Sequence, residues 1–211
     1  MKTIKFTTLT SAVAATLLYS QAALADVSAN IGVVSEYHFR GVAQTTDASA
    51  SAGLDYTNEG FYLGTWAADV GDGLEVDFYG GYGFDITDGL SSSIGFTTYQ
   101  YTGDFDSAYN EVNLGLSYGL FSLDYAIGTR EDDFDLGIVE SDYTFLSLSV
   151  AYEGFYGTFG TYGDESDGEY FEAGYGTQVG GFDVGVSVLV SGSDLNDDET
   201  IYFSIGKTFN L

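Results

Sequence analysis

Three ionisable residues at alternate positions near the start of the chain, Glu36, His38 and Arg40, are the first that could do chemistry. In an extended strand, alternate side chains share one face and lie about 6.6 Å apart. These three would then form a cluster of carboxylate, imidazole and guanidinium groups. At a constriction such a cluster sets the charge selectivity of a pore. The simpler interpretation is an ion pair that lets charged groups sit in the wall of a lumen or at its mouth.

Catalysis is poorly supported by the remaining polar residues. His38 is the single histidine, cysteine is absent, and no serine lies in a G-x-S-x-G motif. A hydrolase or acyltransferase would need a nucleophile beside a base. There is also no Gly-rich phosphate loop and no Cys/His metal-binding pattern. The sequence therefore predicts a protein that is not an enzyme and that carries no cofactor.

Acidic residues dominate the charge. The chain has 32 of them against five Lys and Arg. After residue 25 only Arg40, Arg130 and Lys207 remain as cations, so the formal charge of that part is 3 − 32 = −29. Such a charge argues against nucleic acid as a partner. The acidic stretches at 130–135 and 194–199 offer carboxylates to Ca²⁺ or Mg²⁺, although neither has EF-hand spacing. Solvated loops are the simpler interpretation, and divalent bridges to lipopolysaccharide are the second.

A two-residue rhythm organises the chain around these residues. Between Ile201 and Leu211, apolar side chains alternate with small and polar ones, and Lys207 is the only break. This alternation predicts a strand with one apolar face. We expect about twelve such strands, at roughly 27–39, 50–57, 61–70, 74–84, 90–101, 110–118, 121–128, 143–152, 155–162, 170–177, 182–191 and 201–211.

The joints between these segments alternate between tight Gly-containing turns, such as Glu153-Gly154, and longer acidic stretches. Short turns on one side and long loops on the other are typical of an outer-membrane barrel, and a tilted strand of about ten residues spans a bilayer. The absence of proline suits continuous sheet. We therefore predict an all-β, transmembrane, antiparallel up-and-down barrel with both termini in the periplasm. A secreted β-sandwich is the alternative.

The polar faces of these strands would line the lumen of the barrel. Acidic side chains outnumber basic ones there, so the sequence predicts a porin-like channel for small polar solutes or ions with a weak preference for cations. A closed barrel with a structural or adhesive role through its acidic loops is the alternative. The candidate lumen residues are Glu36, His38, Arg40, Asp55, Glu75, Asp77, Glu111, Asp124, Glu172 and Asp183.

The first 25 residues have the features of a cleavable export signal. Lys2 and Lys5 precede an apolar stretch that ends in Ala23-Leu24-Ala25. This pattern predicts a signal peptide at 1–25, export through the Sec pathway and one barrel domain at 26–211. Together with the strand pattern it predicts the outer membrane of a Gram-negative bacterium, with membrane lipid and lipopolysaccharide as partners. The oligomeric state is left open.

Two stretches carry a resemblance to a known family. The segment from Ser28 to Thr45, SANIGVVSEYHFRGVAQT, resembles the opening of the TorF-like porins, a proteobacterial outer-membrane family of otherwise unknown function. The segment from Gly60 to Val70, GFYLGTWAADV, is similar to a second family motif, although Ala68-Asp69 replaces Ser-Asn. The chain also ends in Leu211, where barrel proteins commonly end in Phe. The resemblance implies an outer-membrane barrel and a pore, with no defined substrate.

Overall fold

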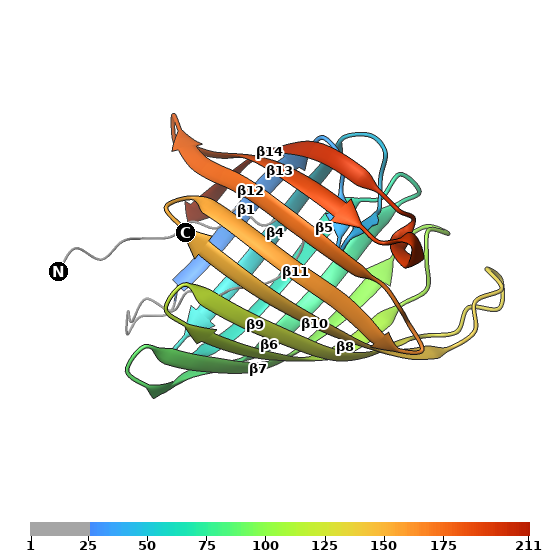
Figure 1. The fold of residues 1–211 in the computed structure, drawn as a ribbon, viewed down its shortest axis with the longest axis horizontal. Helices are drawn as coiled ribbons and strands as arrows, with labels where there is room; N and C mark the ends of the chain where they lie inside the picture. The colour runs from blue at the N-terminus through green and yellow to red at the C-terminus, as the bar shows by residue number, and fades with distance from the viewer. Residues whose placement is uncertain (1–25) are drawn as a thin grey trace.

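The structure, a computed structural model, describes residues 26–211, and the predicted signal peptide lies outside the described residues. Twelve antiparallel strands close into one barrel, in which each strand pairs with its sequence neighbour and β1 closes the ring against β14 (Figure 1). The prediction of an up-and-down barrel of about twelve strands is confirmed. The wall strands are β1 (Asp26–Val34), β4 (Ser49–Asn58), β5 (Phe61–Asp69), β6 (Leu74–Thr87), β7 (Leu90–Tyr101), β8 (Tyr109–Tyr118), β9 (Phe121–Arg130), β10 (Ser141–Tyr152), β11 (Phe155–Asp164), β12 (Glu169–Val179), β13 (Phe182–Ser191) and β14 (Glu199–Asn210).

The two ends of the barrel differ in their connections. At the end where the chain terminates, called the turn end below, every connection has two residues: Glu59-Gly60, Asp88-Gly89, Gly119-Leu120, Glu153-Gly154 and Gly180-Gly181. Three of these pairs have positive φ at both positions, as type I′ hairpin turns require. The opposite end, called the loop end, carries the connections 35–48, 70–73, 102–108, 131–140, 165–168 and 192–198.

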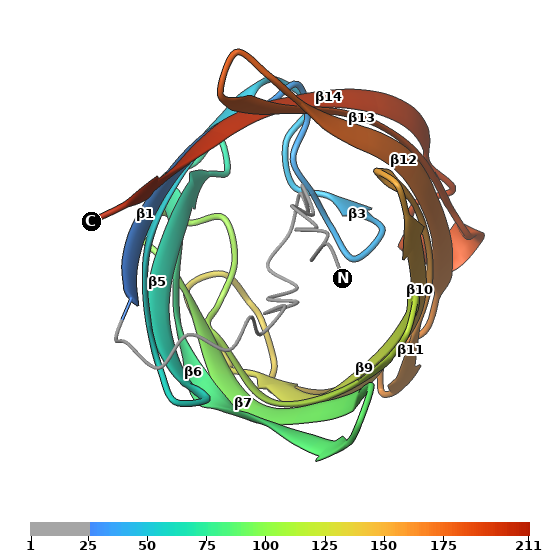
Figure 2. The same cartoon turned by 90° about the vertical axis from the view of Figure 1, so that its left-hand side faces the viewer.

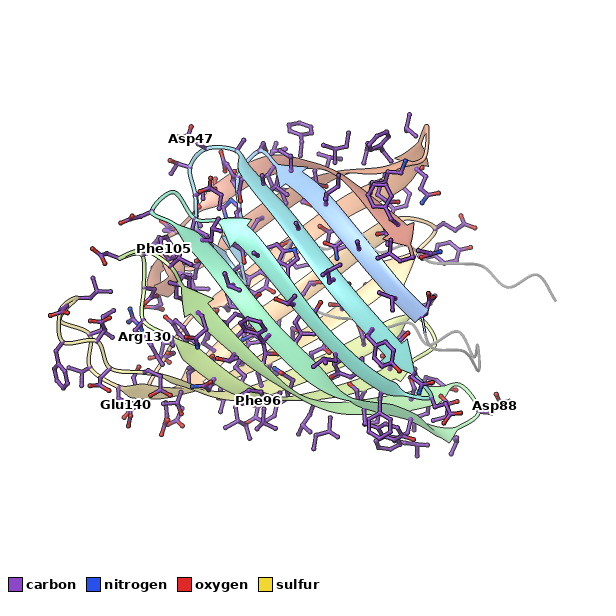
Figure 3. All side chains as sticks on the ribbon, turned by 180° about the vertical axis from the view of Figure 1, so that it is seen from behind. Asp47, Asp88, Phe96, Phe105, Arg130 and Glu140 are labelled. Carbon is purple, nitrogen blue, oxygen red and sulfur yellow. The ribbon has the colours of Figure 1, made fainter. Side chains whose placement is uncertain are left out.

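The outer surface of the wall is apolar around its circumference. Large hydrophobic side chains are exposed on every wall strand, including Leu63 at 64% and Phe203 at 60%. Phe96 points away from the barrel, whereas the acidic residues Asp88 and Glu140 lie beyond the two ends of the strands (Figure 3). An exposed apolar belt of this extent is rare on soluble monomers, and it matches the lipid-facing surface of a membrane barrel.

The first predicted strand is wrong in its length. The expected segment 27–39 ends as a wall strand at Val34, and the chain then bends into the barrel. There β2 (His38–Phe39) and β3 (Val42–Ala43) form a small hairpin inside the ring (Figure 2). Its turn is Arg40-Gly41, with φ of 48° and 87°. Two successive positive φ values again fit a type I′ turn, which reverses the chain in two residues.

Glycine and tyrosine pack together on the lumen face. Tyr79 lies directly across from Gly64, and Tyr143 directly across from Gly128. A methyl group added to either glycine would overlap the ring of its partner tyrosine. The rings therefore lie flat along the wall because the opposite position lacks a side chain. This pairing explains much of the high content of both residues.

One short 3₁₀ helix, η1 (Ser193–Leu195), lies in the last loop. Within residues 26–211, no helix is long and apolar enough to cross a membrane.

Candidate functional site: a hairpin inside the lumen

The segment 36–48, called the lumen hairpin below, is the main structure inside the barrel. The residues on either side of it, Ser35 and Ser49, are hydrogen-bonded to the wall at the loop end. Ser35 exchanges two hydrogen bonds of 2.9 Å with Phe203 of β14, and the Ser49 hydroxyl donates to the Asp69 carbonyl at 2.7 Å. Residues 46–48, the last three of this segment before Ser49, are exposed. The hairpin is therefore a loop of the first connection that folds inward.

The backbone of the lumen hairpin is bonded to itself. The amide of Gln44 donates to the Tyr37 carbonyl at 2.7 Å, and the Tyr37 amide donates to the Thr45 hydroxyl at 3.0 Å. His38 pairs with Ala43 and Phe39 with Val42. The hairpin thus has its own ladder, whereas its attachment to the surrounding wall is made through side chains.

Tyr37 fixes one side of the hairpin to β6. It is 2% exposed, packs edge-on against Trp66 at 5.6 Å between ring centroids, and donates its hydroxyl to Glu75 at 2.6 Å. Tyr101 donates to the other oxygen of Glu75 at 2.9 Å. Burial and the neighbouring carboxylate of Glu75 raise the pKa of Tyr37 well above its usual value, so the hydroxyl stays a donor.

Arg40, at the tip of the hairpin, reaches Glu111 on β8. Its guanidinium makes a two-point contact with both oxygens of the carboxylate, one of them at 3.0 Å. The guanidinium carbon also lies 4.3 Å from the ring centre of Phe145. Glu111 is 1% exposed and accepts further hydrogen bonds from Tyr99, Tyr143 and Asn113. A buried bidentate pair with its remaining lone pairs satisfied is the favourable geometry for such an interaction.

His38 faces a different wall. Its ring stacks on Tyr202 of β14 at 5.3 Å between centroids, and its Nε2 lies 3.3 Å from Glu36. Glu36 also accepts a hydrogen bond of 2.8 Å from Thr200. The predicted cluster of Glu36, His38 and Arg40 on one strand face is therefore not formed. The turn at Arg40-Gly41 directs Arg40 toward β8, while Glu36 and His38 stay against β14.

Apart from Glu36, which lies on the first connection, the predicted lumen carboxylates lie on the inner face of the wall, at two depths. Glu75, Asp77 and Glu111 lie in the loop-end half against or beside the hairpin. Asp77 is fully buried, and neither of its oxygens accepts a hydrogen bond from a described residue. Glu172 also lies in the loop-end half, because it is near the start of β12, and it accepts a hydrogen bond from Tyr156. The other three carboxylates lie nearer the turn end: Asp55 with Tyr79 and Asn30, Asp124 opposite Gly115 and Ser147, and Asp183 with Gln178.

Basic groups balance only a small part of this charge. Among the described residues, Arg40 is the cation that enters the lumen hairpin contacts. Arg130 pairs with Asp106 at the loop end. Lys207 is on the outer face, 5.0 Å and 5.3 Å from the ring centres of Phe182 and Phe209. The break in the apolar face of the last strand is thus covered by aromatic rings, and the lumen wall keeps an acidic excess.

The two acidic loops at the loop end differ in how their carboxylates and backbone are arranged. In the connection after β9, carboxylate oxygens of Glu131, Asp132 and Glu140 lie within 4.8 Å of one another. In the connection before β14, η1 places Leu195 in a buried position, and Ser191 binds the backbone of Asp198. Divalent cation binding at these loops stays a prediction.

The sequence alone did not predict the aromatic packing around the hairpin. Phe39 packs edge-on against Tyr99, and a buried cluster on the opposite wall contains Phe145, Tyr170 and Tyr202. These inward-facing rings are indistinguishable from girdle residues in an alternating pattern. Gly41 was the available signal, because a glycine inside a strand pattern indicates an irregularity or a close approach of the backbone.

Comparison with known proteins places the chain in context. The sequence matches the model of a family described as bacterial protein of unknown function (Gcw_chp) over residues 20–203. No curated protein matches it. Among solved structures, a chain from work on in-meso crystallization of membrane proteins is similar with a TM-score of 0.64 at 9% identity, covering 88% of this chain and 84% of that one. The NanC porin is similar with a TM-score of 0.57 at 10% identity, covering 86% and 98%. At these identities the likeness concerns the fold alone.

Proposed function

The chain belongs to the Gcw_chp family of bacterial proteins of unknown function, and we propose that it is a porin-like channel in the Gram-negative outer membrane. The observation that carries this proposal is the reversal of polarity across the wall, apolar outside and acidic or hydroxylated inside. A polar lumen enclosed by a lipid-facing surface provides a path for small polar solutes or ions. The motif shared with the TorF-like porins supports the same assignment.

The channel is proposed to prefer cations weakly. Asp55, Asp124 and Asp183 face the lumen in the turn-end half, and Arg40 is already paired with Glu111. An acidic wall raises the local concentration of cations and repels anions. Because the field of these groups is screened by salt, the preference should fade as the ionic strength rises.

Conductance of the purified, refolded barrel in a planar lipid bilayer tests this proposal. We expect discrete conductance steps and, in a salt gradient, a reversal potential of the sign for cation permeation. The preference should decline between 0.1 M and 1 M salt, where the screening length falls from about 10 Å to about 3 Å. A reversal potential of the opposite sign would refute the acidic lumen as the source of selectivity.

A closed barrel with a structural or adhesive role is the second candidate. The observation that favours it is the packing of the lumen hairpin, because Tyr37 and His38 are both 2% exposed inside the loop-end half. A barrel that stays silent in bilayers, with and without the hairpin, would support this candidate over the channel.

The proposed location has its own test. The protein should fractionate with outer membranes and migrate at different positions on a gel before and after boiling, as folded barrels resist detergent until heated. A soluble periplasmic monomer that needs no detergent would refute it.

A further inference from the structure

The lumen hairpin is held in a way that distinguishes it from the wall. Its backbone ladder is internal, and its contacts with the barrel beyond Ser35 are side-chain contacts. Moving it out of the lumen would leave every pair of wall strands intact. The wall strands themselves are joined by continuous backbone ladders around the ring. The backbone hydrogen bonds of the hairpin are thus separate from those that hold the wall together.

The contacts that hold the lumen hairpin combine hydrogen bonds with aromatic packing, in which Tyr37 packs on Trp66 and Phe39 on Tyr99. Arg40 contacts Glu111 and Tyr37 contacts Glu75, so strands β8 and β6 carry the two hydrogen-bonded attachments of one side. On the other side Glu36 accepts from Thr200 and His38 stacks on Tyr202. Both ends of the segment are anchored at Ser35 and Ser49, close to the loop-end rim. These anchors would act as hinges about which the segment could swing toward the loop end.

We propose that the lumen hairpin is a gate, closed by the Arg40–Glu111 and Tyr37–Glu75 contacts and opened by rotation about Ser35 and Ser49. This inference rests on the proposed channel function and specifies its regulation. When Arg40 moves away, the carboxylate of Glu111 still accepts hydrogen bonds from Tyr99, Tyr143 and Asn113. A packed closed state and a conducting open state then differ by the position of one loop.

Single-channel recording separates the gate from a fixed constriction. The wild type should switch between a low and a high conductance level. Arg40→Gln, which keeps a polar side chain but loses the charge and the reach of the guanidinium, should raise the fraction of time in the high level at least tenfold, and Tyr37→Phe should raise it less. Arg130→Gln is the matched control, because Arg130 makes an ion pair at the same end of the barrel with Asp106 instead of a hairpin contact.

A reversible tether provides the second measurement. The chain has no cysteine, and a Cβ atom on Gly41 would lie 2.7 Å from that of Tyr170 on β12. The double variant Gly41→Cys and Tyr170→Cys places the two Cβ atoms closer than the about 3.5–4.5 Å of a disulfide, so the hairpin tip must move back slightly for the bond to form. Gly41 also has a φ of 87°, which strains a cysteine there. Oxidation should abolish the high level and reduction should restore it. The reduced form is the control for the substitutions themselves.

A third variant replaces residues 37–46 with a short Gly-Ser linker and should stay in the high level. If this barrel conducts steadily while wild type and Arg40→Gln share one unchanging level, or if oxidation of the tether leaves switching unaltered, the hairpin is a fixed constriction and the gate is refuted. If the shortened barrel carries no current at all, the channel function itself fails. Should the cysteine variant not fold, the dwell times of Arg40→Gln and Tyr37→Phe still decide the outcome.

Discussion

The two halves of the lumen are built from the same alternating strands but are filled differently. In the loop-end half, the hairpin and inward aromatic rings pack together, and the carboxylates Glu75 and Glu111 are bound by several donors each. In the turn-end half, the inward positions are mainly Gly, Ser and Thr, with single tyrosines lying flat on the wall. The same residue type therefore has a different role at each depth: a carboxylate anchors the hairpin in one half and charges the lumen in the other.

If the barrel is the proposed channel, this difference separates the groups that stabilise it from those that line the path. In the packed half, Glu75 and Glu111 are fixed by hydrogen bonds, whereas the buried Asp77 accepts none from the described residues. Polar groups in the turn-end half can be solvated by the lumen. A change that removes a carboxylate should thus cost folding stability in the first half and selectivity in the second.

The largest expected effect comes from Glu111→Ala. The substitution leaves the buried Arg40 without its partner and removes the acceptor of Tyr99, Tyr143 and Asn113. Breaking a buried pair costs about 3–5 kcal/mol of folding free energy. Asp124→Ala, in the turn-end half, should cost less than about 1 kcal/mol. Denaturant-induced unfolding of the two variants in lipid vesicles measures the loss of folding free energy in each. Equal losses would contradict the proposed difference between the two halves.

A second prediction compares the two faces of the wall at one depth. Val186 is outward-facing and pairs with Phe203, whereas the next residue of β14, Ser204, faces the lumen opposite Gly185. Arg at a mid-membrane lipid-facing position costs about 2–4 kcal/mol. We expect Val186→Arg to impair folding far more than Ser204→Arg. The folded fraction after refolding into vesicles, read from the gel shift on boiling, gives the ranking, and the reverse ranking would mean that the strand faces are misassigned.

A third prediction uses the glycine–tyrosine pairs. Gly128→Ala pushes on Tyr143, whose ring is buried and whose hydroxyl is bonded to Glu111 at 2.7 Å. Overpacking of this kind costs about 1–3 kcal/mol. Gly64→Ala pushes on Tyr79, which is half-buried beside the less crowded turn-end lumen and can shift. Its cost should be smaller, with a reduced conductance as the ring enters the lumen. Unfolding curves and single-channel currents of the two variants distinguish these outcomes, and a larger loss for Gly64→Ala would contradict the proposed difference in packing.

The smallest expected effect concerns selectivity. Asp124→Asn combined with Asp183→Asn should lower the cation-to-anion permeability ratio roughly twofold, because both carboxylates face the turn-end lumen. Asp197→Asn with Asp198→Asn removes the same charge from the last loop and should change the ratio less at physiological salt, where screening acts over about 8 Å. Reversal potentials in a salt gradient decide between them. If the Asp197/Asp198 double variant changes the permeability ratio more, the selectivity is set by the loop end and not by the turn-end lumen.

Much of the fold could be read from the sequence because the strand period is two. In the last strand, Ile201, Phe203 and Ile205 are exposed on the outer face, and Tyr202 and Ser204 point inward, as the alternation predicts. The two-residue turns were equally visible, since Glu59-Gly60 and Glu153-Gly154 each end in a glycine, the residue that a positive φ favours. Inward-facing Glu75, Asp77 and Glu111 follow from the same alternation.

The hairpin is where that reasoning failed. Glu36, His38 and Arg40 continue the alternation of β1, so a local pattern extends the strand to Phe39. Tertiary contacts override this local pattern. Tyr37 contacts Glu75 and Trp66, and Arg40 contacts Glu111, on other strands of the closed ring. A sequence pattern reports which face a side chain shares with its near neighbours, but carries no information about partners that lie 38 or 71 positions away.

The sequence by itself determined the strand period, the apolar exterior, the acidic interior and the tight turns, because each depends on residues within one strand or one turn. Only the tertiary structure decided which carboxylates anchor the hairpin and which charge the lumen. Ring closure brings β6, β8, β12 and β14 around the first connection. The role of each inward group then depends on whether the hairpin or solvent occupies the space in front of it, and that is set by contacts between residues distant in the chain.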